Sequence, residues 1–208
     1  MASKAKLDMA YMKCAFAISE LSHAQRKKVG AVIVSPKGQI LAEGCNGTPS
    51  GFDNSCERTE VVGKHRISND PNGMEKCAVC NKIWIGGSQK DELCEKLVTK
   101  EEVIHAESNA ILKMARSHNS SEGATIYCTL TPCFECAKLI VQAGIKRVVY
   151  GEQYPYPGHT GKVRNLGMEL LEQANIQIDF LPFEGENPNK ELSNGQDRNE
   201  RWIDPFET

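Results

Sequence analysis

The sequence has no long apolar run. None of its 208 residues lies in a stretch that approaches the ~18 apolar residues needed by a membrane-spanning helix. The opening residues MASKAKLDMAYMKCAF also lack the unbroken apolar run and small-residue cleavage site of a secretory signal. We therefore expect an intracellular, cytoplasmic protein that is not inserted in a membrane.

The chain also lacks an excess of basic charge. It carries 25 Lys and Arg against 27 Asp and Glu, a formal net charge of −2. Proteins that wrap long nucleic acids usually show a clear basic excess, so we expect no such partner. A few Arg and Lys would still suffice for a local pocket that binds a small phosphorylated ligand.

What the sequence does contain is a regular succession of helical and strand patterns. An amphipathic helix is predicted over residues 5–21, and two strands around a Pro-Lys-Gly turn predict an antiparallel hairpin. Helices that connect parallel strands must cover the faces of the sheet. The order therefore predicts a three-layer α/β/α sandwich with a five-stranded mixed sheet. The expected strands are 29–34, 39–44, 124–130, 146–151 and 176–181, and the later helices are 104–116, 132–144 and 161–174.

Residues 46–103 interrupt this succession. They are rich in Gly, Asn, Asp and Cys and contain no long apolar run. We expect an ordered Cys-rich loop insertion within a single domain that spans residues 1–183. The polar residues 184–208 are expected to form a flexible tail.

The strongest chemical signal is His105-Ala106-Glu107, followed after one strand by Pro132-Cys133-Phe134-Glu135-Cys136. At the start of a helix, Cys133 and Cys136 point the same way because they are three residues apart. With His105 they give three zinc ligands and leave the fourth tetrahedral position for water, as catalytic zinc sites require. Glu107 is then free to move protons. The alternative is a closed four-ligand zinc site with Glu107 on the surface, but the combined motif is a known signature of zinc deaminases.

Several further segments agree with this motif. The chain resembles the cytidine and deoxycytidylate deaminase superfamily, and most closely its deoxycytidylate (dCMP) deaminases, including viral ones. The resemblance runs from about Leu7 to Pro182, with residues 57–103 poorly covered. It rests on VGAVIV (29–34), GCNGTPSG (44–51), IHAESNAIL (104–112), TLTPCFECAKLIVQAGIKRVVY (129–150) and Tyr154.

The resemblance implies hydrolysis of dCMP to dUMP and ammonia, which feeds thymidylate synthesis. Glu107 would protonate N3 of cytosine and then the departing amine. By similarity, Asn46 would hydrogen-bond the deoxyribose and Tyr154 would lie against the substrate. Without the resemblance, Asn46 reads as an ordinary turn residue before Gly47, and Tyr154 as a residue that caps a loop.

The resemblance also implies a homo-oligomer, typically a hexamer, that dCTP activates and dTTP inhibits, with Mg²⁺ accompanying the triphosphate. The alternative reading of the basic residues involved is solvated surface charge. Cys45 stands where the family usually has a tyrosine, which bears on effector affinity and identity. The positions that match the effector site and its switch are Arg26, Lys28, Asn46, Gly47 and Arg116.

A second group of potential metal ligands lies within the insertion. A four-ligand zinc would order this segment through binding energy where apolar burial cannot. The resemblance also implies such a site, since some viral and bacterial relatives carry a second, structural zinc in this region. The alternative is unliganded thiols. The expected ligands are Cys56, Cys77 and Cys80, with His65 or Cys94 as the fourth.

Two other functions compete with dCMP deamination. The first is a deaminase of another substrate, such as dCTP, cytidine or a nucleic-acid base, since tRNA adenosine deaminases share both motifs. The near-neutral charge and the GCNGTPSG turn favour a mononucleotide. The second is a non-catalytic interaction module organised by zinc, because a fold does not determine a function. The presence of Glu107 argues against that module.

Overall fold

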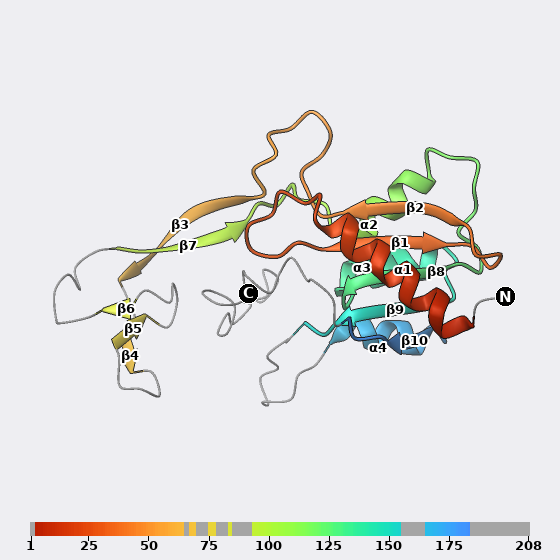
Figure 1. Cartoon of the computed structure of the whole chain (residues 1–208). Coiled ribbons are helices and arrows are strands. Elements are labelled where there is room, and N and C mark those ends of the chain that lie inside the picture. Colours follow the sequence, from red (N-terminus) through yellow and green to blue (C-terminus); the bar gives the residue numbers. More distant parts are fainter. Residues whose placement is uncertain are drawn as a thin grey trace.

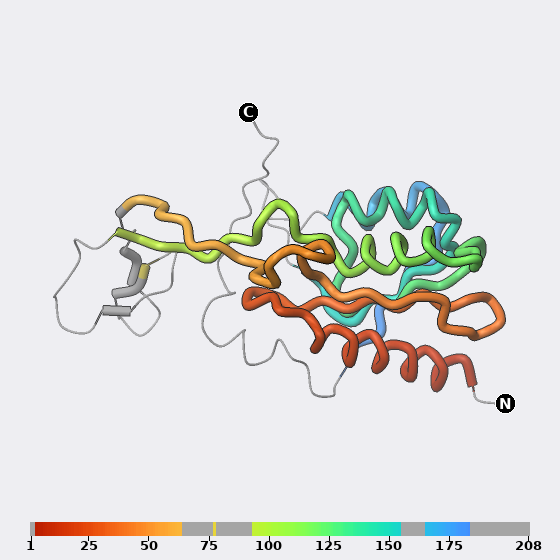
Figure 2. The backbone as a smooth tube through the Cα atoms, turned by 90° about the horizontal axis from the view of Figure 1, so that it is seen from above, coloured from red at the N-terminus to blue at the C-terminus, as the bar shows by residue number. Residues whose placement is uncertain are grey.

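A five-stranded mixed sheet forms the centre of the molecule in the computed structural model. Helix α1 covers one face, and helices α2, α3 and α4 cover the other (Figure 1, Figure 2). The predicted three-layer sandwich is thus confirmed. The structure describes residues 3–64, 67–69, 75–77, 83–84, 93–154 and 165–183.

The elements follow the predicted order, with ends shifted by a few residues. The helices are α1 (Lys4–Ser19), α2 (Ala106–Met114), α3 (Phe134–Gln142) and α4 (Leu166–Gln173). The strands of the central sheet are β1 (Gly30–Val34), β2 (Ile40–Cys45), β8 (Thr125–Leu130), β9 (Arg147–Glu152) and β10 (Gln177–Phe180).

The strand order in this sheet is β10-β9-β8-β1-β2. Strands β8, β9 and β10 run parallel, whereas β1 pairs antiparallel with both β2 and β8. Because α3 follows β8 and α4 precedes β10, both helices begin at the edge where β8 and β9 end. Helix α2 runs into β8 and therefore also begins at that edge. Three helix N-termini thus gather on one side of the sheet.

Strand β1 is buried along its whole length, since helices cover the sheet on both sides. Val32 and Val34 pack toward α1, together with Phe16. Ala31 and Ile33 point to the opposite face and pack with residues of α2, α3 and β8. Because both faces of the strand are buried, it is apolar at every position rather than at every second one.

Part of the insertion folds into strands, where the sequence predicted a loop. Strands β3 (Glu57–Lys64) and β7 (Leu93–Thr99) pair antiparallel in a ribbon that leads away from the sheet (Figure 1). The short strands β4 (Ile67–Asn69), β5 (Glu75–Cys77) and β6 (Ile83–Trp84) form a separate sheet. Paired strands satisfy each other's backbone groups, so the ribbon forms without a long apolar run. The predicted tail lies outside the described residues, and no described helix is long and apolar enough to cross a membrane.

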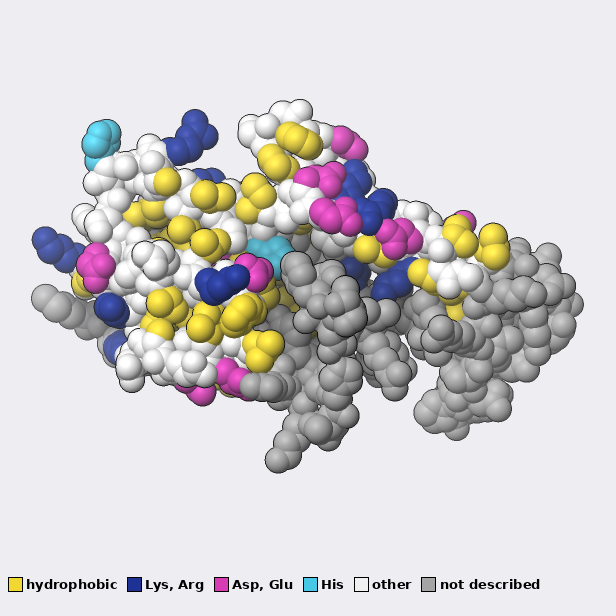
Figure 3. All heavy atoms as spheres, turned by 180° about the vertical axis from the view of Figure 1, so that it is seen from behind, with side chains coloured by type: hydrophobic (Ala, Val, Ile, Leu, Met, Phe, Trp, Pro, Cys, Tyr) yellow, Lys and Arg dark blue, Asp and Glu magenta, His cyan; other side chains and the backbone are white. Residues whose placement is uncertain are grey.

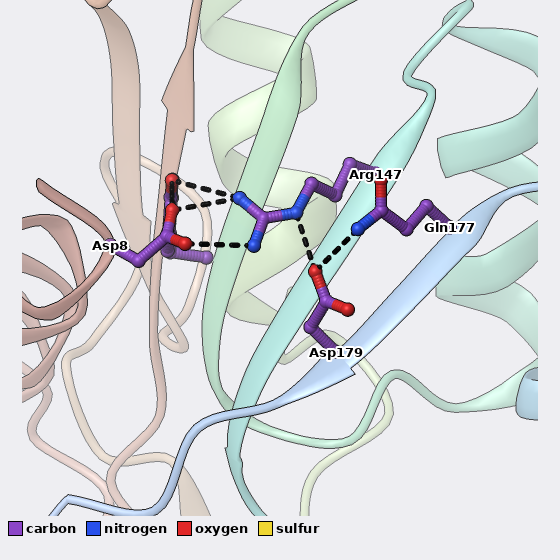
Figure 4. A network of polar contacts seen from close by, with 5 residues as sticks. Asp8, Arg147, Gln177 and Asp179 are labelled. Atoms are coloured by element: carbon purple, nitrogen blue, oxygen red, sulfur yellow. Dashed lines mark hydrogen bonds and ion pairs between the residues drawn. The ribbon is translucent and has the colours of Figure 1, made fainter. Parts of the chain in front are cut away.

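A polar network ties α1 to three strands (Figure 4). The Arg147 guanidinium donates to both carboxylate oxygens of Asp8, at 2.7 and 2.9 Å, and its Nε donates to Asp179 at 2.6 Å. The Tyr127 hydroxyl also donates to Asp8, at 2.6 Å. The side chains of Asp8 and Arg147 are each only 13% exposed. The hydrogen bonds that Asp8 accepts from Arg147 and Tyr127 hold the pKa of its carboxyl below the ordinary value.

Replacing Asp8 with alanine should lower the free energy of unfolding by about 2–3 kcal/mol at neutral pH. The reason is that the largely buried Arg147 guanidinium loses the two hydrogen bonds that it donates to Asp8. A carboxylate with a lowered folded-state pKa stabilises the fold above its ordinary pKa, 3.8 for aspartate, and loses this effect as pH falls through the lower folded value. The gap between wild type and Asp8→Ala should therefore close in acid, as urea unfolding at several pH values would show. Glu43→Ala breaks an exposed ion pair with Lys113 and should change stability by about 0.5 kcal/mol or less.

Candidate active site

The two predicted motifs meet at the N-termini of α2 and α3. His105 is the N-cap residue of α2, Cys133 is the N-cap residue of α3, and Cys136 lies in the first turn of α3. The Nδ1 atom of His105 is 3.3 Å from the sulfur of Cys133 and 3.4 Å from that of Cys136. Within the described part of the chain, this is the only group of three or more His, Cys, Asp or Glu side chains whose potential ligand atoms all lie within 4.8 Å of one another.

These distances fit a zinc ion. Zinc bonds of roughly 2.0–2.1 Å to nitrogen and 2.3 Å to sulfur in a tetrahedron place the two atoms about 3.5 Å apart. The observed separations between His105 and the two cysteines are close to this value. Three donors leave one tetrahedral corner for a ligand from outside the chain, which is the arrangement of a catalytic rather than a structural zinc site.

Glu107 lies in the first turn of α2 and is only 3% exposed. Burial raises the pKa of its carboxyl to about 7, although the neighbouring His105 acts in the opposite direction. Cys128 of β8 lies close enough for its own pKa to be raised by Glu107 in addition to burial, and that thiol therefore stays neutral. A carboxyl group in this environment can take up and release a proton near neutral pH.

The two cysteines differ in their protonation before a cation binds. The pKa of Cys133 is lowered to about 4, mainly because its sulfur accepts a hydrogen bond from Cys136 and also because of His105. The same contact with Cys133 raises the pKa of His105 to about 9. The pKa of Cys136 is raised, because that thiol gives its proton to the hydrogen bond with Cys133 and is buried. A cation is needed to hold both sulfurs as thiolates, and Ser108 Oγ, 3.4 Å from Cys136, can then donate to one of them.

Two glycines allow the backbones around this site to touch. A Cβ atom on Gly44 of β2 would lie 2.5 Å from the carbonyl oxygen of Ala106, so α2 rests directly on that strand. A Cβ atom on Gly167 of α4 would lie 2.5 Å from the carbonyl oxygen of Pro132 and 2.8 Å from the Cys133 backbone. The segments that carry His105 and Cys133 are therefore each supported by backbone contact, with no side chain between.

The turn after β2 is bonded to the start of α2. Gly47 and Ile104 exchange two backbone hydrogen bonds, of 3.1 and 2.9 Å, directly before His105. The side chain of Asn109 also donates to the carbonyl of Cys45, at 3.0 Å. The predicted substrate and effector turn thus adjoins His105, the predicted zinc ligand at the start of α2.

The two predicted substrate residues both have partners within the chain. Asn46 accepts a hydrogen bond from the Val29 N–H at 2.8 Å, and its Nδ2 group donates to the carbonyl of Lys27 at 2.9 Å. That Nδ2 group carries a second proton that a ligand could accept. The Tyr154 N–H donates to Thr131 Oγ1 at 3.0 Å, which places Tyr154 beside the loop that leads to Cys133.

The predicted effector residues are distributed over the molecule. The Arg26 backbone N–H donates to Glu57 at 3.2 Å and its guanidinium donates to Thr99 at 3.2 Å, so Arg26 lies at the base of the β3–β7 ribbon. Lys28 adjoins the backbone that holds Asn46. Arg116 is exposed beyond the last turn of α2, at the opposite end of that helix from His105.

The structure brings together only part of the predicted second zinc site. The sulfurs of Cys77 and Cys94 lie 3.7 Å apart, and both residues are fully buried. Cys56 is separate from them, because its carbonyl accepts a hydrogen bond from the Lys100 N–H at the other end of the ribbon from Cys94. The remaining two predicted ligands, His65 and Cys80, lie outside the described residues.

Sequence reasoning missed the roles of Ser108, Gly167 and Thr131 around this site. Ser108 could have been noticed, since it directly follows the H-A-E motif. The contact between Gly167 and the Cys133 backbone depends on how α4 packs, and no local pattern in the sequence indicates it.

Comparison with known proteins decides the family. The family model described as "Cytidine and deoxycytidylate deaminase zinc-binding region" matches residues 5–152. The chain belongs to this deaminase family. The deoxycytidylate deaminase of Enterobacteria phage T4 is 35% identical to this deaminase over 184 residues, which cover 85% of the chain and 94% of the phage protein.

Solved structures agree with this assignment. The dCMP deaminase of cyanophage S-TIM5, crystallised in complex with dCMP and dUMP, is 33% identical, with a TM-score of 0.60. The match covers 86% of this chain and 100% of the cyanophage chain. A further relative, the ComE operon protein 2 of Bacillus subtilis, is 32% identical over 78% of this chain and 65% of its own length. The chain is a zinc-dependent deaminase.

Proposed function

We propose that this deaminase hydrolyses dCMP to dUMP and ammonia, in the cytoplasm that holds the nucleotide pool. The observation that carries the proposal is the buried Glu107 beside the His105–Cys133–Cys136 ligand set, at one edge of the sheet. The similarity to phage enzymes named for dCMP, one of them crystallised with dCMP and dUMP, supports the choice of substrate.

The chemistry follows from the position of Glu107. Bound zinc would supply hydroxide near neutral pH. Glu107 takes the proton released from that water and gives it to N3 of cytosine. The hydroxide oxygen would bond to C4 of cytosine, and Glu107 would move the remaining proton of that oxygen to the exocyclic amine, so that the C4–N bond breaks and ammonia leaves. Asn46 directs its remaining amide proton toward the deoxyribose, and Tyr154 lies against the substrate.

A substrate panel tests this proposal. We expect loss of cytosine absorbance with dCMP, and much slower loss with dCTP, cytidine or a cytosine-containing oligonucleotide. If one of these alternatives had a higher kcat/KM than dCMP, that compound and not dCMP would be the substrate. No turnover of any of them by zinc-loaded protein would instead favour a non-catalytic interaction module.

Regulation by nucleotides forms a finer part of the proposal. The bonds between Gly47 and Ile104 link the predicted effector turn to the residue before His105, so a triphosphate bound there could shift the zinc ligand. We expect dCTP with Mg²⁺ to raise the rate at low dCMP concentration and dTTP to lower it. Identical rate curves with and without the two nucleotides would remove this part of the proposal.

We also propose that the protein forms a homo-oligomer of six chains, a hexamer. Hydrophobic side chains gather on the face of the molecule that α2, α3 and α4 cover (Figure 3). Exposed apolar patches of this kind mark contact surfaces more often than free surface. Light scattering should give the mass of six chains, and a monomeric mass would contradict the proposal. The large hydrophobic residues exposed on α2, α3 and α4 are Leu112, Phe134, Leu139, Val141 and Leu166.

A second, structural zinc is proposed in the insertion. Two sulfurs on one tetrahedral zinc lie about 3.8 Å apart, close to the 3.7 Å between Cys77 and Cys94. Cys80 and His65 stay the predicted further ligands, and Cys56 is too distant to join them. Metal analysis should find two zinc ions per chain in the wild type and one in Cys94→Ser. A single zinc in both proteins would contradict the second site.

A further inference from the structure

The N-terminus of α4 lies against the loop that carries a zinc ligand. Gly167, in the first turn of α4, contacts the backbone of Pro132 and Cys133 so closely that no side chain would fit between them. The residue that begins the helix is Asn165, whose Oδ1 accepts a hydrogen bond from the Met168 N–H at 3.1 Å. The amide group of Asn165 therefore lies across the first turn of α4, beside the active site.

The other half of this amide has no partner. Asn165 is only 9% exposed. Among the described residues, its Nδ2 is the one buried side-chain nitrogen or oxygen atom without a hydrogen bond. Buried polar groups in proteins are almost always paired, and an exception calls for an explanation such as a bound ligand. An amide N–H₂ group donates, so the ligand must offer acceptor atoms.

The start of α4 offers donors to an anionic acceptor, although Glu169 in its first turn carries charge of the same sign as a phosphate. Backbone N–H groups and the positive end of the helix dipole make a helix N-terminus suitable for phosphate. Helix α4 begins at the edge of the sheet where α2 and α3 present the zinc ligands. Ligands of open α/β sheets bind at the carboxyl ends of the strands, which is this edge.

We propose that Asn165 Nδ2 donates a hydrogen bond to the 5′-phosphate of the nucleotide whose base lies at the zinc ligands. The inference rests on the proposed function, because that function supplies a substrate with a base at one end and a phosphate at the other. It assigns to α4 the recognition of a nucleoside monophosphate over the free nucleoside. Asn165 is thereby a specificity residue, distinct from the proton transfer at Glu107.

Asn165→Asp separates this role from helix capping. Aspartate caps a helix as well as asparagine does, since a carboxylate oxygen accepts the same Met168 N–H bond. It replaces the N–H₂ donor with a negatively charged acceptor that repels phosphate. We expect the KM for dCMP to rise about tenfold or more, and kcat/KM for deoxycytidine to stay within about twofold of wild type. Thermal melting should be unchanged.

A matched control is Gln173→Glu, which adds the same charge at an exposed position near the other end of α4 and should leave the KM for dCMP unchanged. Calorimetric binding gives a readout that does not depend on turnover: wild type should bind dUMP more tightly than deoxyuridine, and Asn165→Asp should lose that preference. An Asn165→Asp protein with wild-type KM for dCMP would overturn the inference. So would equal losses with dCMP and deoxycytidine, which would assign Asn165 to positioning of the zinc loop. A wild-type protein that binds dUMP but does not turn over dCMP would contradict the proposed function and leave the phosphate site standing.

Discussion

Glu107→Gln is expected to lower kcat for dCMP by about 10²–10⁴-fold, because proton transfer by a positioned side chain contributes that much to catalysis. Glutamine has nearly the same size as glutamate, so the buried first turn of α2 should keep its packing. The amide cannot accept the proton from water or pass it to N3 and the leaving amine. Zinc content and melting temperature should therefore stay at wild-type values while turnover is lost.

The measurement is the initial rate of cytosine absorbance loss at saturating dCMP, with zinc determined in the same samples. Glu135→Gln is the matched control, since Glu135 is exposed in the first turn of α3 and pairs with Lys138. It should retain a rate within about twofold of wild type, as expected for an exposed ion pair. A Glu107→Gln protein that turns over dCMP at the wild-type rate would remove Glu107 from the mechanism.

The second large effect is expected at the zinc ligands. Cys136→Ser should lose one zinc per chain and all measurable turnover, because a neutral hydroxyl is a poor substitute for a thiolate in the ligand set. A chelator should likewise inactivate the wild type, and added Zn²⁺ should restore it. Added Zn²⁺ should not restore Cys136→Ser.

Cys14→Ser provides the control for this experiment. Cys14 is half-buried on α1, on the opposite face of the sheet from α3, and has no part in the ligand set. The variant should keep the zinc content and rate of wild type. Full activity in chelator-treated, zinc-free protein would contradict a metal-dependent reaction altogether.

The sequence predicted the sandwich, and it predicted that His105, Cys133 and Cys136 lie together, for a physical reason. Strands such as Gly30–Val34 are covered on both faces, and helices such as α3 begin shortly after a proline and end shortly before a glycine, so the sequence patterns that mark them are local. The predicted zinc ligands lie at helix starts, where the spacing of Cys133 and Cys136 alone places both sulfurs on one side. Their convergence with His105 then follows from the parallel arrangement of the strands.

The insertion was harder to predict because its pairing is not local. Glu57 pairs with Thr99, 42 positions away in the sequence, and the turns between them give no clear hairpin signal. That register sets Cys56 at the base of the ribbon and Cys94 near its far end. Asn165 escaped prediction for a related reason, since the burial of its amide depends on the packing of α4 against the loop before Cys133.

The direct contact between α4 and that loop has a consequence for protein engineering. At Gly167 even one added methyl group would push against the main chain of Pro132 and Cys133. Attempts to reshape the specificity of this enzyme therefore have little freedom on that side, and libraries of variants would be better directed at the turn around Asn46 and at Tyr154. Any displacement of the fourth helix as a rigid rod would, by the same contact, shift a metal-binding sulfur.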